Sequence, residues 1–182
     1  GSSNDGFAIH GANSNDRLGT VSAAGDVNGD GFDDVIVGAS HAESYFSDRA
    51  GQAYVIYGSD SRTTRVRVSD LTDYNLGDGR ETGSEIGFVI HGVEDNDYIG
   101  QYVSAAGDVN NDGLPDLFIG QNVESYTRGV LPKPYYDSND GLSSYLLLNR
   151  GRLKFREVTK ETGLSEKSNR RNRAASIADL DG

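Results

Sequence analysis

Two short stretches rich in aspartate carry the strongest chemical signal in this chain. The first is Asp26-Val27-Asn28-Gly29-Asp30-Gly31-Phe32-Asp33-Asp34, and the second is Asp108-Val109-Asn110-Asn111-Asp112-Gly113-Leu114-Pro115-Asp116. In both, oxygen-bearing side chains stand at loop positions 1, 3, 5 and 9, and a glycine stands at position 6. This spacing, with a backbone carbonyl at position 7, is how a short loop wraps one Ca²⁺.

The aspartate side chains of each loop can lie close together only if a cation balances their negative charges. Three carboxylates that face one another across a few ångströms repel at any ordinary pH. The alternative is a solvated turn that binds nothing, and the shared spacing of two copies argues against it. The expected ligands are Asp26, Asn28, Asp30, the Phe32 carbonyl and Asp34 in the first loop, and Asp108, Asn110, Asp112, the Leu114 carbonyl and Asp116 in the second.

These loops are not EF-hands. An EF-hand needs a bidentate glutamate at position 12 and a helix on each side of the loop. Position 12 is Val37 in the first loop and Ile119 in the second, and both lie in short apolar runs that read as strands. The elements that hold the loops are therefore expected to be β-strands.

The sequence around the loops is repeated as well. The segment from Gly6 to Gly11 returns at Gly87–Gly92, and Val21–Asp26 returns at Val103–Asp108 with one residue inserted between the two matches. A third copy, Ala174–Gly182, ends the chain and places Asp179 and Asp181 at loop positions 1 and 3. Repeats of this kind indicate a propeller or a solenoid.

The order of these motifs resembles the FG-GAP repeat. The motifs are Phe-x-Ile-x-Gly, Asp-x-Leu-Gly, Val-Ser-x-Ala-Gly-Asp-x-Asn-x-Asp-Gly-x-x-Asp and Val-Gly-Ala. That repeat is the blade unit of the integrin α-subunit β-propeller and of many bacterial secreted proteins. Two departures are visible: Ser40 replaces the proline of the family's Gly-Ala-Pro, and Gly120-Gln121-Asn122 replaces the whole triplet. Residues 145–182 look more like related bacterial calcium-propeller repeats.

The resemblance implies an all-β fold, a partial β-propeller of about two to three blades, each made of four antiparallel strands. Residues 1–182 are expected to form one domain, with blade repeats at about 6–92 and 87–160 and a partial repeat at 174–182. The expected strands are Thr20–Gly25, Asp34–Gly38, Gln52–Gly58 and Gly87–His91 in the first blade, Tyr102–Gly107, Asp116–Gly120, Tyr145–Leu148 and Lys154–Thr159 in the second, and Ala174–Ala178 in the third, after an extended segment at Phe7–His10.

Two stretches between these strands carry weaker signals. Arg65–Val68 alternates but is short, and we interpret it as part of a long excursion between the third and fourth strands of the first blade. Lys160–Ser168 is expected to form a turn or a short helical piece. A closed propeller needs about four to eight blades. We therefore expect further blades of a longer parent chain, and the alternative is a ring assembled from several copies.

Composition limits the partners. The chain has 28 Asp and Glu against 17 Lys and Arg, a net charge of −11, which disfavours nucleic acid and anionic membranes. No apolar run approaches the roughly 18 residues of a membrane-spanning helix, so membrane insertion is not expected. The chain has no cysteine, so there is no disulfide framework.

The histidines and the other aspartates favour structural roles over catalysis. His10 and His91 occupy equivalent repeat positions, and catalytic residues rarely repeat in register. His41 is expected to be a solvated loop histidine, with a contribution to a site as the alternative. Asp16 and Asp97 are expected to cap tight turns. No Gly-x-Ser-x-Gly nucleophile motif is present, so we expect no enzyme activity.

The expected function is that of a secreted or cell-surface binding and adhesion module stabilised by structural Ca²⁺, as the resemblance to integrin-type propellers implies. Its ligand would be a protein or a glycan. The alternatives are a lectin-type propeller and a non-catalytic part of a polysaccharide lyase or phospholipase. Loop residues suited to recognition are Tyr45, Tyr126, Tyr135, Tyr136 and the basic cluster Arg170-Arg171-Asn172-Arg173.

Overall fold

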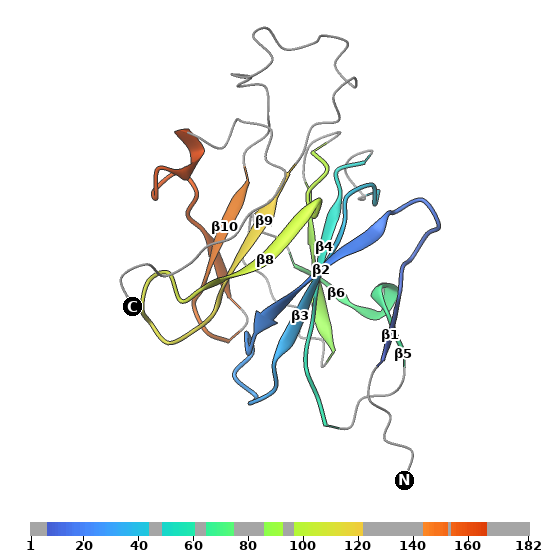
Figure 1. Cartoon of the computed structure of the whole chain (residues 1–182), viewed down its shortest axis with the longest axis horizontal. Helices are drawn as coiled ribbons and strands as arrows, with labels where there is room; N and C mark the ends of the chain where they lie inside the picture. Colours follow the sequence, from blue (N-terminus) through green and yellow to red (C-terminus); the bar gives the residue numbers. More distant parts are fainter. Residues whose placement is uncertain are drawn as a thin grey trace, which may run out of the picture.

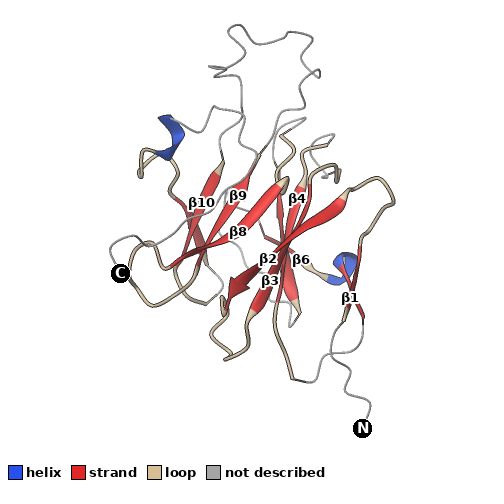
Figure 2. Ribbon diagram, viewed as in Figure 1, coloured by secondary structure: helices blue, strands red, loops and turns tan. Residues whose placement is uncertain are grey.

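The computed structural model describes residues 7–43, 49–60, 65–74, 86–92, 97–121, 144–152 and 154–166. These residues form β-strands joined by loops, with two short 3₁₀ turns, η1 (Val68–Asp70) and η2 (Leu164–Glu166) (Figure 2). The second turn confirms the helical piece expected near Lys160. No helix in this part of the chain has the length and apolar character needed to cross a membrane.

The strands are β1 (Ala8–His10), β2 (Leu18–Gly25), β3 (Asp34–Ala39), β4 (Gln52–Ile56), β5 (Arg65–Arg67), β6 (Thr72–Tyr74), β7 (Gly87–His91), β8 (Tyr102–Gly107), β9 (Asp116–Gly120), β10 (Tyr145–Asn149) and β11 (Phe155–Glu157).

Two twisted sheets stand side by side as propeller blades (Figure 1). In the first blade, β2, β3, β4 and β7 pair in that order and all antiparallel. In the second blade, β8, β9, β10 and β11 do the same. The expected four-stranded antiparallel unit is therefore confirmed in both copies, with strand ends within a few residues of those expected.

The first blade also has a fifth strand that the sequence analysis did not anticipate. β6 lies at the outer edge of the sheet and pairs parallel to β7, with Asp73 opposite Val89. The excursion expected between the third and fourth strands is therefore present between β4 and β7, and it contains β5, η1 and β6. The physical reason is that an outer strand leaves unpaired backbone N–H and C=O groups, which β6 satisfies.

The strand β1 does not join either blade. It pairs parallel to β5 in a separate two-stranded sheet, with Ile9 opposite Val66. Val66, Val68 and Leu71 of the excursion are buried against the face of the first blade, and Ile9 packs against the same apolar cluster. This face of the blade is therefore covered by β1 and the excursion, at the right of Figure 1.

The largest apolar cluster lies between the two blades. The first blade contributes Ile36, Val55 and Phe88, and the second contributes Leu117 and Phe155 among others. The rings of Phe88 and Phe155 meet with their centroids 5.5 Å apart. Burying a large apolar side chain is worth about 1.5–3 kcal/mol, so this cluster holds the two blades in a fixed relation.

Close backbone contact also joins the blades. A Cβ atom added to Gly38 of β3 would lie 1.8 Å from the Gly100 carbonyl oxygen, so only glycine fits at this position. The Thr20 hydroxyl donates a hydrogen bond of 2.8 Å to the same carbonyl. The Ile99-Gly100 motif therefore marks the place where the chain enters the second blade against the first.

Candidate metal centres

Each aspartate-rich loop joins the first two strands of its blade. The first connects β2 to β3, and the second connects β8 to β9. Both begin at a β-bulge, where Gly25 and Gly107 adopt left-handed φ values of 72° and 73°. The bulge, which recurs in both blades, turns the chain out of the sheet directly before Asp26 and Asp108.

In the first loop, the oxygens at positions 1, 3 and 5 turn inward on one another. The Asp26 carboxylate accepts hydrogen bonds from the backbone N–H groups of Gly29, Asp30 and Gly31, at 2.8, 3.0 and 2.9 Å. The Asn28 amide donates to the Asp30 carboxylate at 2.8 Å. The chain thus wraps around its own acidic side chains, as a cation-binding loop does.

The second loop repeats this arrangement. The Asp108 carboxylate accepts hydrogen bonds from Asp112 and Gly113 at 3.0 and 2.6 Å. The Asn110 amide donates to Asp112 at 2.8 Å, which is the distance of the corresponding bond in the first loop. Loop geometry is therefore a property of the repeated sequence and not of one local environment.

The aspartates at position 9 are buried and anchored. Asp34 is 1% exposed and accepts hydrogen bonds from the Val27 and Gly58 backbone N–H groups at 2.8 and 2.7 Å. Asp116 is fully buried and accepts from Val109 and Asn149, both at 2.8 Å. Each of these carboxylates thus ties its loop to the end of the third strand of the blade.

The electrostatics of the loops show how close the carboxylates lie. Burial raises the pKa of Asp34 to about 6, two backbone N–H bonds oppose the change, and the charges of Asp30 and Asp26 add to it. Burial likewise raises the pKa of Asp116, with Asp112 and Asp108 contributing in the same direction. The structure therefore brings the three carboxyl groups of each loop within range of mutual repulsion.

The donor set fits a hard cation such as Ca²⁺. Among the described residues, no three acidic or histidine side chains form a ready-made metal cluster. The loops instead offer mixed oxygen donors: carboxylates, one amide oxygen and one backbone carbonyl, which is the chemistry that Ca²⁺ prefers. Asp26 Oδ1 accepts two backbone bonds, whereas Asp26 Oδ2 and both carboxylate oxygens of Asp108 accept one each and so keep a second lone pair for an ion. Asp33, at position 8, is exposed and takes no part in these hydrogen bonds.

Several sequence predictions fall outside the described residues. They are Asp179 and Asp181 of the partial third loop, the strand expected at Ala174–Ala178, the tyrosines Tyr45, Tyr126, Tyr135 and Tyr136, and the basic cluster at residues 170–173. These remain predictions.

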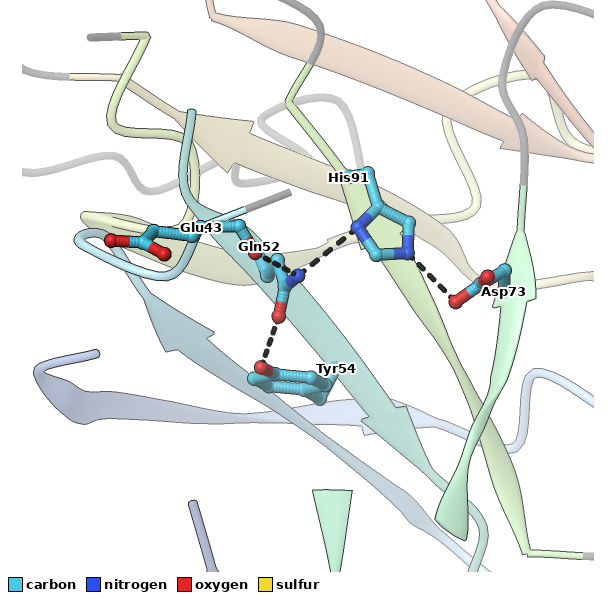
Figure 3. A network of polar contacts seen from close by, with 5 residues as sticks. All are labelled: Glu43, Gln52, Tyr54, Asp73 and His91. Carbon is cyan, nitrogen blue, oxygen red and sulfur yellow. Dashed lines mark hydrogen bonds and ion pairs between the residues drawn. The ribbon is translucent and has the colours of Figure 1, made fainter. Parts of the chain in front are cut away.

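A second polar cluster, shown in Figure 3, surrounds His91. The His91 ring contacts Asp73 through Nε2 at 2.8 Å and Gln52 through Nδ1 at 3.1 Å. Gln52 also donates to the Glu43 carbonyl at 3.0 Å and accepts from the Tyr54 hydroxyl. Both ring nitrogens of His91 are thus engaged in a brace between β4, β6 and β7, which agrees with a structural role. Local sequence patterns do not reveal this brace because Asp73 comes from the excursion.

His41 and Asp16 also have structural contacts. The His41 ring packs with its centroid 5.0 Å from that of the Tyr98 ring, and its Nδ1 lies 3.0 Å from the Ser40 hydroxyl, so this loop histidine is half-buried and only partly solvated. The connection leading into β8 brings Tyr98 over it. Asp16 is buried and accepts a hydrogen bond of 2.8 Å from the Asn13 N–H, which confirms a turn cap.

Comparison with known proteins agrees with this fold. The model of the FG-GAP repeat matches residues 18–56, which span β2 to β4 and include the first loop. Integrin alpha pat-2 of Caenorhabditis elegans is 32% identical over 114 residues, covering 63% of this chain and 8% of that protein. Phosphatidylinositol-glycan-specific phospholipase D of Rattus norvegicus is 33% identical over 104 residues, covering 57% of this chain and 11% of that protein.

The chain therefore carries an integrin-like FG-GAP repeat, and its sheets are blades of a partial β-propeller. The aligned part corresponds to only 8–11% of the length of these relatives. Their names are those of an integrin alpha and a phospholipase D, so the similarity alone does not assign one activity to this chain.

Proposed function

We propose that this chain is a non-catalytic binding module whose blades are stabilised by one Ca²⁺ in each aspartate-rich loop. The observation that carries the proposal is the duplication of one loop geometry: equivalent aspartates accept equivalent backbone bonds at equivalent ends of two blades. A solvated turn that binds nothing would not require a buried carboxylate, yet Asp34 and Asp116 are buried at the same position of both loops.

The ion would act as a structural cross-link. It would replace carboxylate repulsion with attraction and fix the turn between the first two strands of each blade. Extracellular modules bind calcium at roughly 10⁻⁴–10⁻³ M. A ligand present at 100 times its Kd stabilises the folded state by about 2.7 kcal/mol per site, which is a large share of the stability of an ordinary domain.

We place recognition of a partner in the loops at the ends of the blades. We also propose that the module acts outside the cell. The similarity to an integrin α subunit supports an adhesion role, and the net charge of −11 favours a protein or glycan ligand over nucleic acid. A second candidate is a non-catalytic propeller part of a larger hydrolase, which the similarity to a phospholipase D favours.

Isothermal titration calorimetry with Ca²⁺ on chelator-treated, desalted protein tests the calcium proposal. We expect two binding sites in the wild-type chain and one in each of the variants Asp30→Ala and Asp112→Ala. The partial loop at Asp179 and Asp181 lacks positions 5, 7 and 9 and should bind poorly.

The matched control is Asp33→Ala, because Asp33 lies in the same loop and is exposed at position 8. It should keep both sites. Absence of binding in the wild-type chain, or loss of a site in Asp33→Ala but not in Asp30→Ala, would contradict the assignment.

A further inference from the structure

Asn149 is a fully buried polar residue at the boundary between the two blades. It is the last residue of β10 and belongs to the second blade. Its side-chain amide nevertheless donates a hydrogen bond of 2.9 Å to the carbonyl of Val27, which is position 2 of the loop of the first blade. A buried side chain of one blade thus reaches the backbone of the other blade's loop.

The same residue also holds the loop of its own blade. The backbone N–H of Asn149 donates to the carboxylate of Asp116 at 2.8 Å. On the other side, the backbone N–H of Val27 donates to the carboxylate of Asp34 at 2.8 Å. Four residues therefore form a continuous path, Asp116 to Asn149 to Val27 to Asp34, between the position-9 ligands expected in the two loops.

The orientation of the Asn149 amide is fixed by its surroundings. Its carbonyl oxygen accepts a hydrogen bond of 2.9 Å from the Gly151 N–H. The NH₂ group must therefore face the opposite way, where the Val27 carbonyl lies. Because all three partners are backbone groups or a buried carboxylate, the path has little freedom to rearrange without losing a bond.

The first blade does not contain the same device. Gly58 holds the equivalent place there, since its N–H donates to Asp34 as that of Asn149 donates to Asp116. A Cβ at Gly58 would lie 2.5 Å from the Asp33 carbonyl oxygen and 2.6 Å from the Phe32 Cβ, so no side chain fits. The side chain of Asn149 is therefore an addition that breaks the repeat.

We propose that Asn149 is a positioning residue that couples the two loops, so that ordering of one loop orders the other. The inference rests on the proposed calcium sites for the identity of the ligand. A cation that fixes Asp116 also fixes the Asn149 backbone, and the Asn149 side chain then holds Val27 and through it Asp34. Coupling between two sites is reciprocal, so filling either loop raises the affinity of the other.

Calorimetry of calcium binding tests this coupling through a double-mutant cycle. Disabling the second loop with Asp112→Ala should weaken binding at the first loop by about fivefold or more, the usual lower range for coupled sites. In the background of Asn149→Ala, the same change should leave the first loop unaffected. An equal effect of Asp112→Ala in both backgrounds would overturn the proposal.

Hydrogen exchange of the metal-free protein gives a readout that needs no calcium. In Asn149→Ala, backbone amides of the first loop, such as Val27 and Gly31, should exchange severalfold faster than in the wild-type chain. The neighbouring exposed variant Arg150→Ala should leave them unchanged. Unchanged exchange in Asn149→Ala would overturn the coupling even if both loops bind calcium.

The two failures are thus distinguishable, because an absence of calcium binding would refute the proposed function while exchange still decides the coupling. If Asn149→Ala does not fold, Asn149→Gly replaces it, since glycine is the residue that the first blade uses at this place. It should give the same loss of coupling and the same faster exchange.

Discussion

Each aspartate-rich loop buries its last aspartate and leaves the aspartate at position 5 exposed. This division explains the different roles of the residues. Asp34 and Asp116 accept two backbone N–H bonds each and so form the base of the loop. Asp30 and Asp112 are exposed, where the proposed ion could reach them while keeping part of its hydration shell.

For the calcium-free protein we expect the contribution of Asp34 to stability to fall as the pH rises from about 4 to about 6. Its pKa in the folded chain is about 6 against an ordinary 3.8, chiefly because of burial. The folded state therefore binds the proton more tightly than the unfolded state, and this advantage is lost as the carboxyl group ionises. At about 1.4 kcal/mol per pKa unit, the loss is on the order of 2–3 kcal/mol.

Thermal melts of calcium-depleted wild-type and Asp34→Asn protein across this pH range measure the effect. As the pH rises from about 4 to about 6, the wild-type protein should lose stability relative to Asp34→Asn. Saturating Ca²⁺ should make the wild-type protein more stable with rising pH instead, because the ion binds the ionised carboxylate. Asp33→Asn serves as the exposed control. A wild-type curve that runs parallel to that of Asp34→Asn would contradict the prediction.

At the scale of elements, the repeated sequence pattern predicts the strands that flank the loops, whereas it does not predict the additional strand β6 of the excursion. β2, β3, β8 and β9 flank the loops, and their alternation and loop boundaries are local signals. β6 pairs with β7 parallel and from the edge, and only the tertiary structure decides such a partner. For β1, the extended segment expected at Phe7–His10 is present, but its pairing with β5 of the excursion was not anticipated.

The candidate site shows the same division between local and non-local information. The donor residues of each loop follow from spacing, because a nine-residue loop needs them at fixed positions. The anchoring of Asp116 by Asn149, and the bond from Asn149 to Val27, join residues far apart in sequence. Likewise Asp73 reaches His91 only because β6 lies beside β7.

The excursion should contribute to stability through its apolar residues. Leu71 is 9% exposed and packs with Val66 and Val68 on the face of the first blade. Truncation to Ala removes buried methyl groups and leaves a cavity, which costs about 2–5 kcal/mol for leucine. Urea denaturation of Leu71→Ala should show this loss, and Ser69→Ala in the same turn should change stability little. Equal midpoints for the two variants would mean that the excursion does not cover the blade.

The contact between blades should tolerate no side chain at Gly38. The Cβ of Gly38→Ala would lie 1.8 Å from the Gly100 carbonyl oxygen and 2.4 Å from the Thr20 hydroxyl oxygen. Backbone must move to relieve this clash, so we expect a loss of about 1–3 kcal/mol or more. Gly19→Ala is the matched control, because its nearest atom lies at 3.8 Å. Wild-type stability of Gly38→Ala would show that the blades are not in close contact.

At the scale of the whole molecule, calcium should decide the stability of the propeller. The chain carries a net charge of −11, and each loop concentrates carboxylates that repel. Excess chelator should therefore lower the melting temperature. A stabilisation of about 2.7 kcal/mol per site at 100 times Kd corresponds to a shift of several degrees in a chain of this size.

This shift should be specific to the loops. Asp30→Ala should remove much of the calcium response of the first blade, and magnesium should replace calcium poorly because it demands a tighter octahedral shell. A melting curve that is identical with calcium and with excess chelator would show that the ion has no structural role.

The most direct test of the account is a crystal structure of the calcium-soaked chain. We expect one ion in each complete loop, about 2.3–2.6 Å from its oxygens. The ligands should be Asp26, Asn28, Asp30, the Phe32 carbonyl and Asp34 in one loop, and Asp108, Asn110, Asp112, the Leu114 carbonyl and Asp116 in the other. Empty loops at saturating calcium, or Asp33 as a ligand in place of Asp34, would contradict the claim that these repeats are calcium-binding blades.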